Sequence, residues 1–308
     1  METSCAHLHL RFCLALSLGL ICRVRGGAPA AICIFRRLVY HLLHMKARAI
    51  GSRESLGGTR MSQPISMPWS DPVFPAPPHS WEGVDVAVFT YTPNPEGLAA
   101  ALPPGIEPGE GMGLITMLSY PQSVVRPFKE LVVLVPVTVE GEPGNYIPHI
   151  FVTTDEALIA GREIAGYPKL IADIEWERDG DAFHFSASRW GTEFLKCDGT
   201  VTGPAPEGME QMQSEASARP TYNYKLIPGP AGEIEVEEIT ATHLEVVPTK
   251  VELGTAKLTT TPAEGASVSN IVPSSEGMLI VMKSNNTIPA GKVIRRITDR
   301  VASPAEVA

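Results

Sequence analysis

The residues best suited to covalent chemistry lie in Gly161-Arg-Glu-Ile-Ala-Gly-Tyr-Pro-Lys169, a segment that ends on a single lysine. A lysine amine attacks a ketone to form a Schiff base, and only the neutral amine is a nucleophile. Pro168, Leu170 and Ile171 flank Lys169, so the amine is expected in apolar company, where desolvation disfavours its charged form. The segment therefore indicates imine chemistry on a ketone-bearing substrate.

The alternation of apolar and polar residues after Lys169 supports a second, simpler interpretation of this lysine. If a strand begins at Lys169, its side chain falls on the face of Asp173 and Glu175, opposite Leu170 and Ile174. On that face the amine would be an ordinary solvated surface charge. The local sequence leaves the two interpretations open.

A short helix that stops abruptly is expected to position the lysine. Thr153, followed three residues later by Glu156, has the capping-box spacing of a helix start. Gly166 suits the left-handed residue that ends a helix, and Pro168 cannot continue one. These signals predict that Lys169 is the first residue of a new strand, held by a stiff Tyr-Pro step.

Residues 161–169 resemble the active-site segment of the acetoacetate decarboxylase family, in which a Gly-Arg-Glu tripeptide leads through an aromatic-Pro-Lys step to the imine-forming lysine. The similarity covers most of residues 61–300 and includes the segments 69–75, 130–137 and 219–228. The resemblance implies that Lys169 forms the imine with a small keto-acid substrate.

A glutamate and three further side chains complete the expected site. Glu130 opens an apolar run at the position of a family active-site glutamate, and the resemblance implies that it shuttles protons. Without the resemblance it would be a solvated glutamate at a strand end. Arg126, four residues earlier, is a candidate for binding the substrate carboxylate, or else a loop charge. Arg162 and Tyr167 are the other substrate-binding candidates, with a structural arginine and a core tyrosine as the alternatives.

Three departures from the family pattern bear on the reaction. Family decarboxylases place an arginine for the substrate carboxylate shortly before the first strand, and residues 79–84 contain none. Another family glutamate is replaced by Ile115, and Leu170 stands where a second lysine often follows the first. The leading hypothesis is a lyase that decarboxylates a small β-keto acid. The alternatives are a pyruvate aldolase-dehydratase that uses the same imine, and a non-catalytic barrel that binds a hydrophobic ligand.

Other chemistries find little support in the sequence. His149 and His184 lack the spacing of metal ligands, so neither a metal nor a cofactor is expected. The sequence contains no Gly-x-Ser-x-Gly motif, phosphate loop or Cys-x-x-Cys pair.

Many short strands, few helices and no strand–helix–strand rhythm predict a single, mainly β (α+β) domain with an antiparallel sheet. A short helix is expected at 94–102, and Asp179-Gly180 gives the clearest hairpin signal. The family resemblance implies a cone-shaped β-barrel and a homo-oligomer. The strand-like segments are 84–91, 114–120, 131–139, 171–177, 182–188, 222–227, 234–239, 243–247, 251–260 and 278–282.

Composition separates residues 1–60 from residues 61–308. The first segment carries nine Lys or Arg and two acidic residues, which leaves sixteen basic and thirty-two acidic residues for the second. We expect residues 1–60 to be disordered, a targeting segment or a mis-assigned start, outside the barrel domain at 61–308. The acidic domain argues against a nucleic-acid partner. It has one cysteine and no span for a membrane, so a cytoplasmic location is expected.

Overall fold

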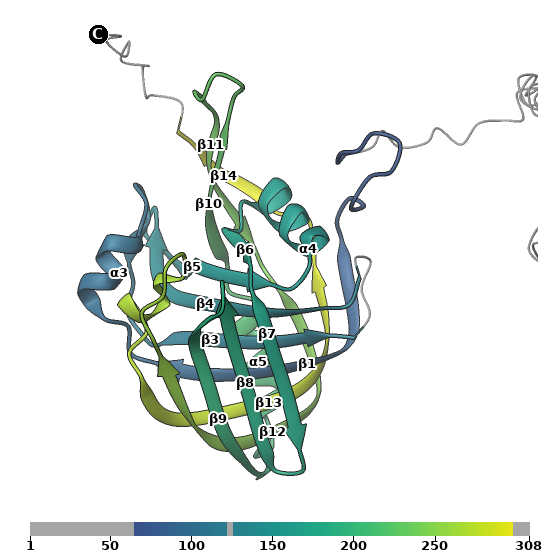
Figure 1. Cartoon of the computed structure of the whole chain (residues 1–308), viewed down its shortest axis with the longest axis vertical. Coiled ribbons are helices and arrows are strands. Elements are labelled where there is room, and N and C mark those ends of the chain that lie inside the picture. Colours follow the sequence, from purple (N-terminus) through teal and green to yellow (C-terminus); the bar gives the residue numbers. More distant parts are fainter. Residues whose placement is uncertain (1–64, 122–125, 298–308) are drawn as a thin grey trace, which may run out of the picture. The chain divides into compact units, whose positions relative to one another are not determined.

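Strands dominate the chain, as the sequence pattern predicts (Figure 1). The structure, a computed structural model, describes residues 65–121 and 126–297. The expectations for residues 1–60 lie outside these described residues. In chain order the strands are β1 His79–Tyr91, β2 Glu107–Pro108, β3 Gly113–Tyr120, β4 Phe128–Val139, β5 Glu142–Val152, β6 Lys169–Ile171, β7 Asp173–Asp179, β8 Ala182–Arg189, β9 Thr192–Pro204, β10 Thr221–Pro228, β11 Ile234–Thr242, β12 Glu245–Thr260, β13 Ser275–Ile288 and β14 Lys292–Arg296.

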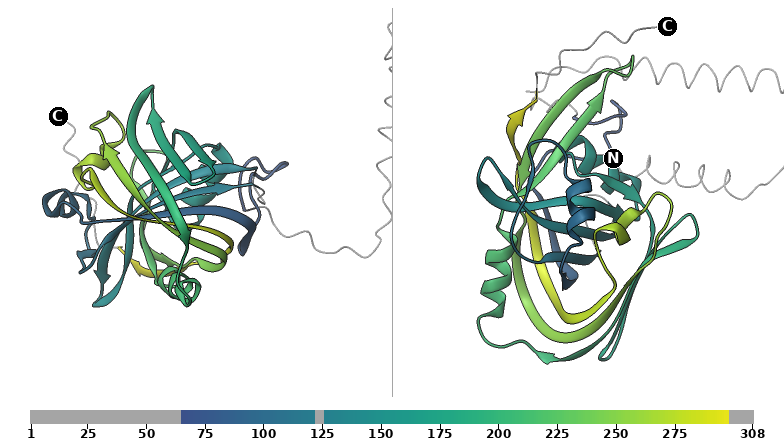
Figure 2. Two further views of the ribbon diagram at one scale, coloured as in Figure 1. Left: turned by 90° about the horizontal axis from the view of Figure 1, so that it is seen from below. Right: turned by 90° about the vertical axis from the view of Figure 1, so that its left-hand side faces the viewer.

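The strands form one strongly curved sheet in the order β14-β11-β10-β5-β4-β3-β1-β13-β12-β9-β8-β7, with β2 beside β4 and β6 beside β5 (Figures 1 and 2). Neighbouring strands are antiparallel except for the β10–β5 and β5–β6 pairs. Register shifts within pairs such as β4–β5 and β12–β13 bend the strands. The prediction of a mainly β, antiparallel domain is confirmed.

The expected closure into a barrel is wrong for the part of the chain that the structure describes. The terminal strands β14 and β7 do not pair with each other. Strand β10 joins β5 through only two residue pairs, Thr221–Asn145 and Tyr222–Tyr146. Beyond these pairs β10, β11 and β14 extend away from the other strands of the sheet (Figure 1).

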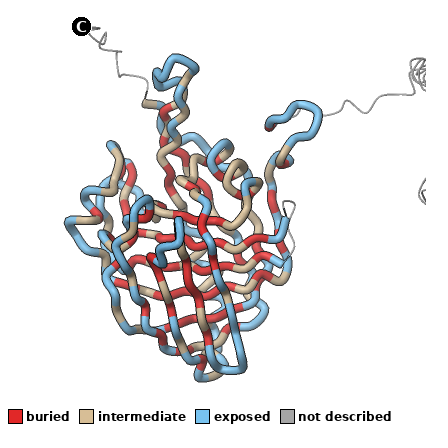
Figure 3. The backbone as a smooth tube through the Cα atoms, in the orientation of Figure 1, coloured by how far each residue is buried: buried red, intermediate tan, exposed pale blue. Residues whose placement is uncertain are grey.

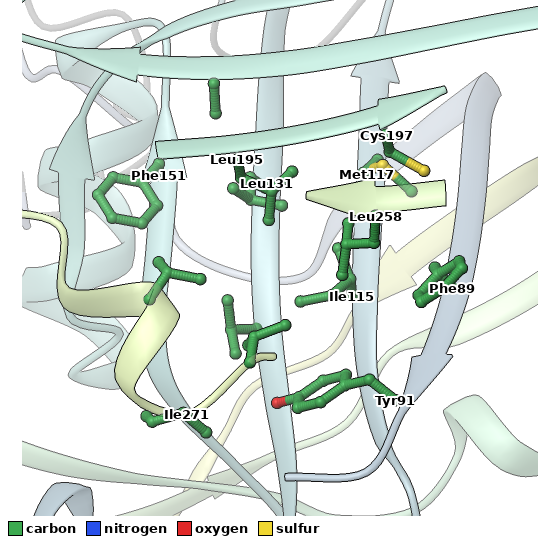
Figure 4. Packing of buried hydrophobic residues seen from close by; sticks show 14 of the residues in the cluster. Phe89, Tyr91, Ile115, Met117, Leu131, Phe151, Leu195, Cys197, Leu258 and Ile271 are labelled. Carbon is green, nitrogen blue, oxygen red and sulfur yellow. The ribbon is translucent and has the colours of Figure 1, made fainter. Parts of the chain in front are cut away.

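Side chains on opposite faces of the sheet enter two hydrophobic clusters. In β3, Ile115 and Met117 are fully buried in the larger cluster (Figure 4), whereas Leu118 belongs to the second. Figure 3 shows how extensively the central strands are buried. Strand β4 is buried along nearly its whole length, as its continuous apolar run predicts. A pocket on the second cluster's face can therefore form without breaking the main core.

The helices are short: α3 Pro95–Ala101, α4 Asp155–Ala160, η1 Gly161–Ala165, α5 Met209–Ser217 and η2 Ser267–Asn270. Helix α3 lies where it is predicted, and the Asn94 side chain accepts hydrogen bonds from the amides of Glu96 and Gly97. The predicted hairpin also forms, with Gly180 at φ 57° between β7 and β8. None of the helices in the described residues is long and apolar enough to cross a membrane.

The buried His149 of β5 should make the free energy of unfolding depend on pH. Its ring stacks on Phe151 with 6.3 Å between ring centroids, and burial lowers the pKa of His149 to about 4. Between this pKa and the unfolded value of about 6.5, the unfolded chain binds more protons, so the free energy of unfolding falls as the pH is lowered. We expect this residue to contribute a loss of about 2 kcal/mol between about pH 7.5 and 5.

The His149→Phe variant keeps a ring against Phe151 but cannot titrate. Denaturant unfolding at the two pH values should therefore show a smaller acid loss in His149→Phe than in the wild type. Other titrating groups are the same in both proteins and cancel in the comparison. Equal acid losses would contradict the burial of a neutral imidazole.

Candidate active site

Lys169 is buried at the start of β6, the strand position that the sequence predicts. It pairs with Ile150 of β5, and its side chain is 10% exposed. The alternating pattern suggested a solvent-facing amine instead. Ile171, two residues later, is indeed exposed, but Gly161 of the short element η1 packs on the aliphatic stem of Lys169.

The chain before Lys169 folds as a continuous helical stretch, α4 followed directly by η1, and then stops abruptly. Gly166 has φ 78°, the left-handed conformation predicted for it, and a Cβ at this glycine would meet Lys225 Cβ at 2.5 Å. The predicted capping box is wrong. The N-cap of α4 is Thr154, whose side chain makes no capping hydrogen bond, and Thr153 Oγ1 accepts from the amide of Lys129 instead of capping the helix.

Gly161 makes room for the lysine side chain. A Cβ at residue 161 would lie 2.6 Å from both Cδ and Cε of Lys169. Gly161 has ordinary helical dihedrals, so alanine would suit the local backbone and helix propensity alone would favour it. Close approach to Lys169 therefore explains the glycine that opens the Gly-Arg-Glu tripeptide.

We expect Gly161→Ala to lower kcat about 100-fold, because a displacement near 1 Å of a reacting group can have an effect of this size. The added methyl must push the flexible lysine away from its partner, while the fold stays intact. Steady-state kinetics together with thermal unfolding measure the two effects separately. Wild-type kcat in a folded variant would contradict the close packing of Gly161 on Lys169.

The lysine amine forms a buried ion pair with Glu130. Lys169 Nζ lies 2.7 Å from Glu130 Oε1, and the glutamate side chain is 8% exposed. The Tyr120 hydroxyl donates a hydrogen bond to Glu130 Oε2 at 3.3 Å. Burial, followed by the charge and hydrogen bond of Glu130, raises the pKa of Tyr120 well above its usual value, so the phenol remains a donor. The three groups form a chain along which a proton can move over short distances.

Two aromatic rings surround the amine. Lys169 Nζ lies 5.6 Å from the ring centroid of Tyr167 and 5.8 Å from that of Phe128. The Tyr167 hydroxyl lies 2.7 Å from Thr242 Oγ1, which fixes the ring. Burial raises the pKa of Tyr167 to about 12, the Thr242 hydrogen bond opposes the shift and the Glu130 charge adds to it. Both rings limit the access of water to the amine.

Lys169 and Glu130 line a cavity of about 170 Å³ on the face of the second hydrophobic cluster. They are the only Lys, Arg, His, Asp or Glu side chains on its wall among residues 65–121 and 126–297. The aliphatic part of the wall includes Val86, Val88, Leu118, Val132, Leu134 and Ile150. A smaller cavity of about 60 Å³ shares Lys169 and Tyr167 with it. The arrangement suits a mostly apolar ligand with one reactive carbonyl.

The two arginine candidates lie away from this cavity. The Arg126 side chain is 82% exposed, and its Nε lies 3.2 Å from Glu156 Oε1. Arg162 is exposed and donates from Nη1 to the backbone carbonyl of Lys169 at 3.4 Å. Their placement does not bring either guanidinium to the cavity. Arg162 instead holds the backbone of the lysine strand.

Ile115, which replaces a glutamate of the family pattern, does not line the cavity. Its side chain is fully buried in the larger cluster, on the face of β3 away from the cavity. Leu114 and Thr116, its neighbours, line the cavity instead. Sequence reasoning missed Tyr120, which ends a predicted strand but has no motif that marks it as a partner of Glu130.

The residues 65–121 and 126–297 contain no group of three or more His, Cys, Asp or Glu side chains that could hold a metal ion. His184 forms a pair with Asp198 on the surface, at 2.7 Å, and His149 is packed in the sheet. Cys197 is buried, and burial raises the pKa of its thiol to about 12, so it is a poor nucleophile.

Solved structures share this fold. One is an acetoacetate decarboxylase from Legionella pneumophila, with a TM-score of 0.69 and 24% identity over 80% of this chain and 99% of that chain. Another is MppR, an enduracididine biosynthesis enzyme complexed with pyruvate, with a TM-score of 0.65 and 19% identity over 75% and 97% of the two chains. At these identities the likeness establishes the fold.

Sequence comparison establishes the family. The family model described as acetoacetate decarboxylase matches residues 62–297. A relative from Bradyrhizobium diazoefficiens, acetoacetate decarboxylase 1, is 29% identical over 185 residues, which cover 59% of this chain and 72% of that protein. The acetoacetate decarboxylase of Chromobacterium violaceum is 27% identical over 58% and 72% of the two chains. The chain belongs to the acetoacetate decarboxylase family and is an enzyme of the carbon–carbon lyase class.

Proposed function

We propose that this protein decarboxylates a β-keto acid through a Schiff base on Lys169. The observation that supports the proposal best is the buried contact of 2.7 Å between Lys169 Nζ and Glu130 Oε1 at the wall of a mostly apolar cavity. An amine in this position meets a substrate ketone away from bulk water. The adjacent carboxylate accepts the ammonium proton and so frees the nucleophile.

The reaction balances through four steps. Lys169 Nζ attacks the ketone carbon, and loss of water gives a protonated imine. The bond to the carboxylate carbon then breaks, carbon dioxide leaves, and the electron pair moves onto the imine as an enamine. A proton from Glu130, now a carboxylic acid, returns to the enamine carbon. Water finally hydrolyses the imine and releases the methyl ketone and the free lysine.

Glu130 and Tyr120 suit the proton transfers of these steps. Glu130 touches the amine through Oε1 and the Tyr120 hydroxyl through Oε2, so each of its oxygens has a fixed partner. A positioned acid/base group typically contributes a factor of about 100 to 10,000 to the rate. The low dielectric of the apolar wall strengthens both contacts.

A second candidate reaction is a pyruvate aldolase-dehydratase reaction with the same imine. The observation that favours it is that no arginine stands among the described residues that line the cavity, whereas the decarboxylases of the family use an arginine for the substrate carboxylate. The pyruvate complex of MppR shows that a protein of this fold holds a 2-keto acid. An enamine made from pyruvate would attack an aldehyde and then lose water.

Product analysis distinguishes the two reactions. With acetoacetate labelled with ¹³C in its carboxylate, a decarboxylase releases labelled carbon dioxide and acetone above the uncatalysed rate. With pyruvate and an aromatic aldehyde, an aldolase-dehydratase forms a conjugated product that absorbs light. Release of carbon dioxide without the conjugated product supports the proposal. The conjugated product without carbon dioxide would support the second reaction instead.

That the protein is a homo-oligomer and that it is cytoplasmic both stay predictions.

A further inference from the structure

One wall of the cavity carries a polar atom that has no partner. Asn286 of β13 is 1% exposed and lines the cavity that holds Lys169 and Glu130. Its Oδ1 accepts a hydrogen bond from Ser284 Oγ at 2.8 Å, which orients the amide. Its Nδ2 is buried and has no hydrogen-bond partner among the described residues. A buried donor without a partner is costly, so it marks a place where a ligand atom can accept.

Strand pairing and ring packing connect Asn286 with the side chains beside Glu130. Asn286 pairs directly with Trp81 of β1, so the two side chains lie on the same face. The Trp81 ring packs on Tyr120 with 5.3 Å between centroids, and the Tyr120 hydroxyl donates to Glu130. The amide of Asn286 is therefore linked to the Lys169–Glu130 pair through two adjacent side chains.

The cavity extends well beyond what a four-carbon keto acid needs. Its wall follows β3 from Tyr120, beside Glu130, to Leu114, a stretch of about 20 Å at the usual rise of a strand. Val88 and Leu134 continue the aliphatic lining along neighbouring strands. The cavity that holds the amine thus also contains a buried neutral donor without a partner, Asn286 Nδ2, and a long apolar wall.

We propose that the substrate is a 3-keto acid with an unbranched apolar chain, whose carboxylate accepts a hydrogen bond from Asn286 Nδ2. The ketone carbon lies at Lys169 Nζ and the chain follows β3 toward Leu114 and Leu134. A neutral amide takes the place of a cationic clamp and holds the carboxylate less tightly before it leaves as carbon dioxide. This inference rests on the proposed decarboxylation and specifies its substrate class.

The first test is a chain-length series with the wild-type protein. Acetoacetate, 3-oxohexanoate and 3-oxooctanoate differ only in apolar chain length. Each added methylene that leaves water should raise kcat/KM about fourfold, which corresponds to about 0.8 kcal/mol of transfer free energy. A rise across the series supports the proposal. The highest kcat/KM with acetoacetate, followed by a fall, would overturn it.

The second test removes the donor and keeps the size of the side chain. We expect Asn286→Leu to raise KM for 3-oxohexanoate tenfold or more, because a hydrogen bond to a charged group is worth about 1.5–3 kcal/mol. Cyanoborohydride trapping of 2-pentanone, the matching ketone without the carboxylate, should stay within about twofold of wild type. Asn285→Leu, the same change at the adjacent exposed residue, is the control and should alter neither value.

Equal loss of 3-oxohexanoate turnover and 2-pentanone trapping in Asn286→Leu would show that Asn286 only shapes the cavity, and would overturn its role toward the carboxylate. An unchanged KM would overturn it as well. Failure of the inference is distinct from failure of the proposed function. If decarboxylation itself is absent, the wild type releases no carbon dioxide from any of the three keto acids and traps none of them on Lys169.

Discussion

Lys169→Met should abolish decarboxylation, with kcat reduced on the order of 10⁴-fold or more, the scale seen when a covalent nucleophile is removed. Methionine keeps the length and apolar character of the side chain, so the packing against Gly161, Tyr167 and Phe128 is largely retained. It offers no nitrogen for an imine. The remaining groups of the cavity cannot accept the electron pair of the breaking bond.

The control for this variant is Lys196→Met. Lys196 lies on the surface, with a side chain 40% exposed and paired with Asp198. Its replacement should leave kcat and KM unchanged. Carbon dioxide release from acetoacetate, measured for both variants at equal folded protein, separates the loss of the amine from a general effect. Residual turnover in Lys169→Met within tenfold of wild type would exclude the imine mechanism.

Glu130→Gln should lower kcat about 100- to 10,000-fold, the usual contribution of a positioned acid/base group. Glutamine keeps the shape of the side chain and can still accept from the Tyr120 hydroxyl. It cannot take a proton from the Lys169 ammonium or return one to the enamine. Slow imine formation should persist, because the amine itself remains in the cavity.

The same variant should also unfold more easily. Breaking a buried ion pair by removing one partner costs about 3–5 kcal/mol when the other charge stays buried, since that charge loses its counterion. Denaturant unfolding measures this loss. In Glu130→Leu combined with Lys169→Met, both charges are gone, and most of the stability should return. Glu175→Gln, an exposed residue of β7, is the matched control. Wild-type kcat in Glu130→Gln would rule out its acid/base role.

The sequence predicted the elements near Lys169 well because their signals are local. Gly166 and Pro168 stop the helix by their own backbone preferences, and Asn94 caps α3 with its own side chain. The capping box failed for a tertiary reason: Thr153 faces the amide of Lys129 on the adjacent strand. A local sequence pattern does not show that a residue distant in the sequence will use the threonine hydroxyl.

The environment of the lysine could not be read from its neighbours in sequence. Alternation suggested an exposed side chain, whereas η1 folds over Lys169 and Gly161 contacts its aliphatic stem. Family resemblance pointed to Glu130, but not to Tyr120 or Asn286, which reach the cavity through strand pairing. Closure of the sheet was also mispredicted, because the divergence of β10 from β5 depends on long-range geometry.

Reductive trapping tests the central role of Lys169 most directly. Borohydride added during turnover of acetoacetate reduces the imine to a stable secondary amine, and peptide mass mapping then locates the modified residue. We expect an isopropyl group, from the acetone imine, on the peptide that contains Lys169, and loss of activity in proportion to its formation. Active protein that turns over acetoacetate in borohydride with Lys169 unmodified, or an adduct confined to another lysine such as Lys225, would contradict the mechanism.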